Sequence, residues 1–234
     1  MNTKLRLRQA VLEFKRKTAT EQPKWATRKS SQQALEVLTA VIPELIGGSA
    51  DLSPSNNSFL KGLDSYQKSN RLGRNLHYGV REHAMGSILN GLVLHGGLKS
   101  FAATFMVFSD YMRPTMRLAA LMKIPSIFLF THDSFWVGED GPTHQPTEHL
   151  ATMRAIPGLE VLRPSDAEET NFCWQLALEK RTGAHHPVTP GKPHSALIDP
   201  DCGPTCYAFT RQALPVLGKP ADWRDSVRKW GAWV

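Results

Sequence analysis

Short apolar runs of β-strand length alternate along this chain with segments whose apolar residues recur at helical spacing. The strand-like runs lie at residues 44–48, 98–103, 124–130, 159–162 and 204–210. Strands that alternate with helices of about 10–15 residues are typical of parallel βαβ units, in which helices cover the sheet. The sequence therefore predicts an α/β fold: a mainly parallel, twisted sheet flanked by helices on both faces.

Helices are expected from the same kind of periodicity. They lie at residues 30–39, 84–93, 107–123, 145–154 and 167–180. Ser30 or Ser31 is the expected cap of the first helix, and Asp166 that of the last. Pro114 lies inside the third pattern, so this segment must contain either a kink or a later helix start.

Both ends of the chain and one internal segment fall outside this alternation. Residues 1–27 predict an amphipathic helix followed by a linker. The residues spaced for one face of this helix are Leu5, Val11, Leu12 and Phe14. Residues 183–203 hold four prolines and little periodicity, which indicates an irregular insertion, and residues 216–234 form a basic, tryptophan-rich tail. One main domain is therefore expected at residues 28–215.

The composition argues against a membrane protein, a nucleic-acid binding protein and a disulfide-rich secreted protein. No apolar run approaches the roughly 20 residues of a membrane span. The net charge is +7, but aromatic and basic residues do not interleave as they do in nucleic-acid binding motifs. We therefore expect neither a membrane nor a nucleic acid as partner. Three cysteines are too few for a disulfide scaffold, which fits a reducing compartment and a cytoplasmic location.

Chemically versatile side chains follow several of the expected strands. Residues 77–85 contain a carboxylate at a helix start and two histidines, and residues 131–134 and 138–146 add two more histidines, acids and glycine turns. Ligands in open parallel sheets bind beyond the carboxyl ends of the strands. Because these loops follow strands or lead into helices at that edge, the sequence predicts a ligand site there.

Three ordered motifs resemble the pyrimidine-binding domain of transketolase. They are Gly47 to Asn56 (GGSADLSPSN), Tyr78 to Glu82 (YGVRE) and Gly138 to Pro146 (GEDGPTHQP). The resemblance covers residues 24–182 and resumes at 203–215. It implies transfer of a two-carbon ketol unit between sugar phosphates in the pentose phosphate pathway, with thiamine diphosphate and Mg²⁺ or another divalent metal as cofactors.

The resemblance also implies which residues hold the cofactor. Glu82 matches the glutamate that bonds to the ring nitrogen of the aminopyrimidine and promotes its imino tautomer, so that the exocyclic nitrogen can remove the thiazolium proton. Phe105, Phe108 and Tyr111 match an aromatic pocket that stacks on the pyrimidine. Asp51 matches a structural position at the cofactor pocket or the subunit interface.

Other matching positions are implied to bind the substrate. His132, Asp140 and His144 match residues that contact sugar hydroxyls or phosphate oxygens, and His144 is also expected to be catalytic. Arg28, Ser55 and Arg211 match a clamp on the sugar phosphate, since guanidinium fits phosphate bidentately. The insertion at residues 183–203 puts Arg211 later in the chain than in the family, which leaves its position open.

This sequence contains only part of what the family uses. The metal–diphosphate signature, Gly-Asp-Gly with a downstream Asn, does not occur. The resemblance thus implies a partner, a diphosphate-binding transketolase domain or subunit, in a homo- or hetero-oligomer. Alone, the chain is expected to turn over little. The alternative is a non-catalytic truncated paralogue that pairs with a full-length transketolase and regulates it.

We expect no metal ligands in the chain itself. Cys202 and Cys206 have three histidines upstream, but the spacing matches no standard structural zinc site.

Overall fold

The computed structural model describes residues 3–134, 137–181, 202–220 and 222–230, and its centre is a six-stranded parallel sheet. The strand order is β3-β2-β4-β5-β7-β6. The strands are β2 (Leu45–Ser49), β3 (Asn75–His77), β4 (Lys99–Phe105), β5 (Ile127–Thr131), β6 (Glu160–Leu162) and β7 (Thr205–Phe209). Every neighbouring pair is parallel, which confirms the predicted α/β class.

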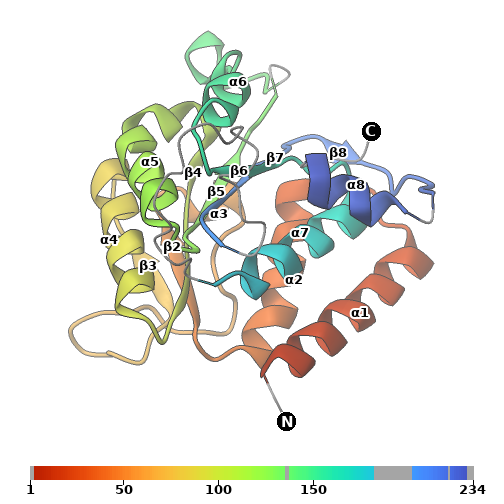
Figure 1. Ribbon diagram of the computed structural model, residues 1–234, viewed down its shortest axis with the longest axis horizontal. Coiled ribbons are helices and arrows are strands. Elements are labelled where there is room, and N and C mark those ends of the chain that lie inside the picture. The colour runs from red at the N-terminus through yellow and green to blue at the C-terminus, as the bar shows by residue number, and fades with distance from the viewer. Residues whose placement is uncertain (1–2, 135–136, 182–201, 221, 231–234) are drawn as a thin grey trace, which may run out of the picture.

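Helices cover both faces of this sheet (Figure 1). Helices α4 (Glu82–His95) and α5 (Arg113–Met122) lie on one face. Helices α1 (Thr3–Glu21), α2 (Thr27–Val41), α7 (Ala167–Glu179) and α8 (Trp223–Trp230) lie on the other. The shorter pieces are α3 (Ser53–Asn56), α6 (His149–Arg154) and the 3₁₀ segments η1 (Met106–Met112) and η2 (Pro142–His144).

The two faces of the central strands are buried in two separate apolar clusters. In β4, Phe101 and Ala103 point to the cluster under α2 and α7, whereas Ala102 points to the cluster under α4 and α5. In β5, Leu129 and Phe128 divide in the same way. This division follows from the two-residue period of a strand, and burial on both faces explains why the strands are continuous apolar runs in the sequence.

The start of helix α2 differs from the expected one, and the start of α5 decides between two alternatives that the sequence left open. Helix α2 begins at Thr27 rather than at Ser30 or Ser31, and its cap residue Ala26 makes no side-chain bond. The short strand β1 (Trp25–Ala26), paired with β8 (Ala213–Leu214), leads directly into this helix. The third helical pattern divides into η1 and α5, with Pro114 in the first turn of α5, which confirms the later start.

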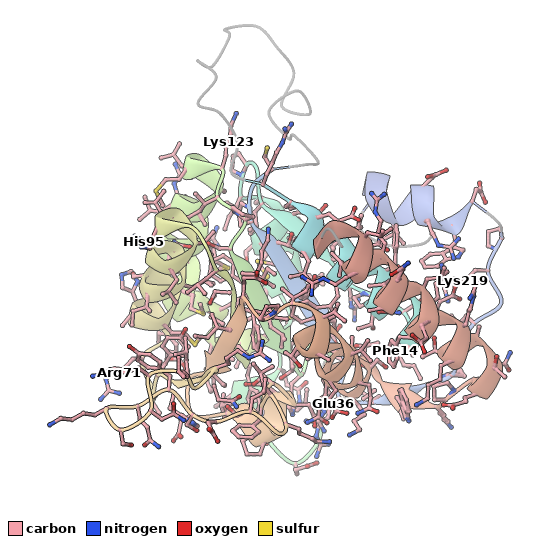
Figure 2. All side chains as sticks on the ribbon, turned by 90° about the horizontal axis from the view of Figure 1, so that it is seen from below. Phe14, Glu36, Arg71, His95, Lys123 and Lys219 are labelled. Carbon is pink, nitrogen blue, oxygen red and sulfur yellow. The ribbon has the colours of Figure 1, made fainter. Side chains whose placement is uncertain are left out.

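Helix α1 and helix α8 both pack against the main core. Leu7, Val11 and Phe14 of α1 are buried, while Leu5 and Leu12 are about half exposed (49% and 47%). The buried face is therefore only partly the one expected from spacing. In α8, Trp223 and Val227 join the same cluster. Figure 2 places Phe14 and Lys219 on the side of the molecule away from His95 of α4.

Strand β3, at the edge of the sheet, is not among the strands predicted from the sequence. It has only three residues and pairs with β2 alone. The predicted insertion at residues 183–203 lies outside the described residues except for Cys202 and Gly203.

The cysteines are buried and form no disulfide. Burial raises the pKa of the Cys173 and Cys206 thiols well above the ordinary value, so both are poor nucleophiles. Among the described residues, no helix combines the length and the apolar character needed to cross a membrane.

Asp166 joins helix α7 to the segment that follows β8. Its Oδ1 accepts from the backbone N–H of Glu169 at 2.9 Å, which caps α7 as predicted. Its Oδ2 accepts from the backbone N–H of Leu217 at 2.9 Å and from the ammonium of Lys219. Both charged side chains are almost fully buried (0% and 2% exposed). The Asp166 carboxylate therefore both caps helix α7 and forms a buried ion pair with Lys219.

We expect Asp166→Ala to lower the free energy of unfolding by about 3 kcal/mol or more, because it removes the cap and leaves a buried ammonium without its main partner. Asp166→Asn is the matched control, since it keeps a capping oxygen but no charge, and it should lose less. Urea unfolding followed by circular dichroism measures both. An Asp166→Ala protein as stable as the unsubstituted chain would contradict this account.

Candidate functional site

The predicted site residues converge at the carboxyl edge of the sheet. Asp51 and Ser55 follow β2, Glu82 follows β3, and Phe105 is the last residue of β4. His132 directly follows β5, and Arg211 follows β7. Because the strands are parallel, all of these positions lie at one edge. This agrees with the general position of ligand sites in such sheets.

An aromatic cluster lies at the end of β4. The rings of Phe105 and Phe108 stack with centroids 5.8 Å apart and an interplanar angle of 10°. His144 approaches Phe108 edge-on at 5.3 Å, and His132 lies 4.0 Å from Phe105. Tyr111 extends the row at 6.2 Å from Phe108 and is 64% exposed. The predicted aromatic residues therefore form one cluster together with both predicted histidines.

Glu82 is the first residue of α4 and is 7% exposed. A carboxylate at this position is favoured by the positive end of the helix dipole. Thr104 Oγ1 donates to Glu82 Oε1 at a long 3.4 Å, the one hydrogen bond to this carboxyl among the described residues. The carboxyl therefore keeps capacity for a further partner. A flat heterocycle with a ring nitrogen fits this combination of buried acid and aromatic cluster.

Arg28 contacts Ser55 and His132. Its Nη1 donates to the backbone carbonyl of Ser55 at 2.6 Å and lies 3.4 Å from His132 Nε2. Burial, followed by the charge of Arg211, lowers the pKa of the Arg28 guanidinium, and Asp140 opposes the shift. Two of the predicted substrate-binding residues, Ser55 and His132, thus contact Arg28, and two others, Arg211 and Asp140, change its pKa. The contact with Ser55 uses its backbone carbonyl, and the Ser55 hydroxyl takes no part in it.

A chain of buried polar groups positions His132. Ser49 Oγ donates to Asn56 Oδ1 at 2.7 Å, and Asn56 Nδ2 donates to Thr131 Oγ1 at 2.6 Å. Thr131 Oγ1 lies 3.0 Å from His132 Nδ1. Because a guanidinium can only donate, His132 Nε2 must accept from Arg28, and Nδ1 then carries the proton and donates to Thr131. The network therefore connects β2 to β5 and selects one tautomer.

His132 is held neutral by its surroundings. Burial is the largest cause that lowers its pKa to about 4, and the charges of Arg28, Arg211 and His144 lower it further. His132 and Asp51 also share a left-handed backbone, each with φ of 63°. Such a conformation costs energy for a residue other than glycine and often marks functional positions.

Arg211 is held by the loop that contains Asp140. Its Nη1 donates to the backbone carbonyl of Val137 at 3.2 Å, and its Nη2 forms an ion pair with Glu139. Strand β7 pairs with β5 in register, so the residues after both strands emerge side by side. The later position of Arg211 in the sequence therefore does not remove it from the site.

Several residues of this edge had no role in the sequence analysis. Asn56, Thr104 and Thr131 supply the hydrogen bonds described above. Asp133, 4% exposed, accepts from Arg163 Nε at 2.6 Å, and burial raises its pKa against the opposing charge of Arg163. All of them lie at or just after strand ends or, for Asn56, in the turn after β2. That position is the signal that could have identified them.

A hollow of about 520 Å³ lies at the opposite edge of the sheet. Its lining includes Ile42, Glu44, Leu98 and Pro125, which precede β2, β4 and β5, and Lys99, the first residue of β4. It contains none of the predicted site residues. We assign the candidate site to the carboxyl edge, because the charged, aromatic and strained residues gather there.

The depressed pKa of His132 has a measurable consequence. Since the imidazole titrates at about 4 in the folded chain and at about 6.5 when unfolded, the unfolded chain binds more protons between these values. The free energy of unfolding should therefore fall as pH falls from about 6.5 to 4. NMR titration of the imidazole should give a midpoint near 4 for His132.

Arg28→Met is the matched variant for this titration. It removes one cationic cause and keeps most of the burial, so the midpoint of His132 should rise but not reach its ordinary value. A midpoint that Arg28→Met leaves unchanged would show that Arg28 does not act on this histidine.

Comparison with known proteins gives a consistent result. The family described as "Transketolase, pyrimidine binding domain" matches residues 23–188. A transketolase from Treponema pallidum is 49% identical over 210 residues, which are 89% of this chain and 29% of that protein. The chain thus spans less than a third of that relative.

Solved structures show the same similarity. A Pichia stipitis transketolase in complex with sedoheptulose-7-phosphate has a TM-score of 0.74 and 40% identity, covering 86% of this chain and 28% of that one. A chain titled "Split gene transketolase, inactive beta4 tetramer" shares the fold, with a TM-score of 0.61 and 24% identity over 85% of this chain and 56% of that one. The chain belongs to the transketolase family, through its pyrimidine-binding domain.

Proposed function

We propose that this chain supplies the pyrimidine-binding half of a transketolase active site, for transfer of a two-carbon ketol unit between sugar phosphates. The observation that carries the proposal is the meeting of three groups at one sheet edge: the buried carboxyl of Glu82, the aromatic cluster, and the Arg28–His132 pair. An acid, a stacking surface and cationic donors are what an aminopyrimidine and a sugar phosphate require.

We assign the cofactor contacts to the first two groups. The Glu82 carboxyl hydrogen-bonds to a ring nitrogen of the pyrimidine of thiamine diphosphate, and Phe105, Phe108 and Tyr111 orient the ring by stacking. Asp51, held in a left-handed conformation after β2, has a structural role at the edge of this pocket. The bound cofactor supplies the carbon nucleophile, and the residues of this chain supply its orientation and a site for one proton on Glu82.

We assign the substrate contacts to the remaining groups. The charge of Arg211 lowers the pKa of Arg28, and we assign both guanidinium groups to one anionic group of the substrate, with Ser55 beside Arg28. His132, Asp140 and His144 face the sugar hydroxyls, where neutral His132 acts as a hydrogen-bond partner rather than as a cation. His144, edge-on to Phe108, is our candidate for proton transfer.

Activity in this proposal depends on a partner. Diphosphate and Mg²⁺ provide most of the polar anchoring of the cofactor, and we infer that a diphosphate-binding transketolase domain or subunit holds them in a homo- or hetero-oligomer. The fold also occurs in the chain titled a split gene transketolase, so it is compatible with such a division. We further propose residues 28–215 as the functional unit, residues 1–27 and the basic tail at 216–234 as its flanks, and the cytoplasm as its location.

Glu82→Gln should abolish ketol transfer in a reconstituted enzyme. Coexpression with a diphosphate-binding transketolase polypeptide, followed by assay with thiamine diphosphate and Mg²⁺, should restore activity that the chain lacks alone. Glu82→Gln should then reduce kcat by about 100-fold or more, the usual range for a lost proton-transfer group. Gln keeps the size of the side chain but cannot exchange a proton.

Glu13→Gln is the matched control, because Glu13 is exposed on α1, far along the chain from the site. It should leave the reconstituted activity unchanged. Full activity with Glu82→Gln would refute the role of Glu82. Assembly with the partner but no activity under any condition would favour the alternative, a non-catalytic paralogue that regulates an intact transketolase.

A further inference from the structure

His149, the first residue of α6, is a buried histidine without a hydrogen bond. Its side chain is 3% exposed. Neither ring nitrogen has a hydrogen-bond partner among the described residues. Leaving a buried polar group unsatisfied costs about 1–3 kcal/mol, so such a group in a well-packed protein requires an explanation.

Two carboxylates face this ring from different elements. Asp110 Oδ2, on η1, lies 3.3 Å from Nε2, and Glu148 Oε2, just before α6, lies 3.7 Å from Nδ1. One ligand atom from each of the three residues lies within 4.8 Å of the other two. Ligands about 2.0–2.2 Å from one metal ion are separated by about 3–4 Å, so only a small contraction would bring all three onto an ion.

We propose that Asp110, Glu148 and His149 form a site for a divalent metal ion, with Zn²⁺ as the best fit. Zn²⁺ accepts both imidazole nitrogen and carboxylate oxygen as ligands, and the two negative charges of the carboxylates balance the ion. Asp110 and Glu148 are 59% and 65% exposed, so water can complete the coordination. The sequence alone predicts no metal ligand at these three residues.

The alternative is a simple ion pair between a protonated His149 and the two carboxylates. That arrangement would satisfy the ring nitrogens through N–H···O bonds, but 3.3 and 3.7 Å are long for such bonds, and neither meets hydrogen-bond geometry. Metal coordination explains the missing hydrogen bond of one ring nitrogen, because a ligating nitrogen presents a lone pair and no proton.

The site would couple two parts of the candidate active site. Asp110 lies on η1 between Phe108 and Tyr111, and His149 follows the loop that contains His144. An ion held by both elements would fix the distance between the aromatic cluster and His144, whose ring is now 5.3 Å from Phe108. The metal-binding inference itself does not depend on the proposed function, since it is measured by binding alone.

Competition for Zn²⁺ against a chromophoric chelator tests the proposal. The full chain is used, with His185, His186 and His194 replaced by Gln in every sample, so that these other histidines cannot compete. His149→Gln should weaken Zn²⁺ binding by at least about 100-fold, beyond the loss typical of residues that only support a ligand. His95→Gln, on the exposed end of α4 (Figure 2), should change nothing.

Two additional measurements guard against misfolding and non-specific binding. Asp110→Asn and Glu148→Gln alter exposed side chains, which are tolerant of change, and each should also weaken Zn²⁺ binding while the circular dichroism spectrum stays the same. The ¹⁵N shifts of the His149 ring should move on addition of Zn²⁺. Equal Zn²⁺ affinity in all variants, or a His149 ring that stays doubly protonated with Zn²⁺ present, would overturn the proposal.

Discussion

The parallel register of the six strands is the constraint on which the rest of the structure depends. Register pairs Phe105 with Thr131 and Ser49 with Ala103, so β4 and β5 end at the same level and β2 ends two residues before them. Burial on both faces enforces it: a slip by one residue would exchange the two faces and mismatch every apolar side chain. The residues that follow these strands therefore emerge together, and a site can be assembled from loops that are distant in the sequence.

Buried polar groups add precision to that arrangement. The Ser49–Asn56–Thr131–His132 chain connects two strand ends with side-chain bonds of 2.6 to 3.0 Å. In a low-dielectric interior such bonds are strong when every member is satisfied, and costly otherwise. The network thus stabilises the left-handed backbone of His132 and selects its tautomer. Apolar packing alone would position the strand ends but not the imidazole.

The predictability of this structure divides along physical lines. Central strands were predictable because both of their faces are buried, which produces long apolar runs such as that of β5. Strand β3 was missed because a three-residue edge leaves almost no periodic signal. Helix α2 begins before the expected serine caps, because the pairing of β1 with β8 sets where the chain enters the helix, and no local cap residue does so.

The site divides in the same manner. Glu82, Phe105 and His132 were accessible because motif spacing and strand ends are properties of the sequence. The tautomer of His132, the backbone contact of Ser55 and the unsatisfied ring of His149 depend on distances between side chains from different elements. Arg211 was predictable only in part. The insertion at residues 183–203 left its place in the structure open, and the pairing of β7 with β5 puts it at the carboxyl edge of the sheet.

Electrostatics then explains why the edge suits an anion. Arg211 acts on both Arg28 and His132 and lowers the pKa of each, so the positive groups of the site destabilise one another. Only Asp140 and Glu139 oppose them among the loop contacts described above. A phosphate between the two guanidinium groups would relieve this repulsion and gain charge-assisted hydrogen bonds. Neutral His132, whose two ring nitrogens bond to Arg28 and Thr131, adds no further positive charge to this edge. Burial, followed by these charges, lowers the pKa of His132 and keeps its imidazole uncharged beside the two guanidinium groups.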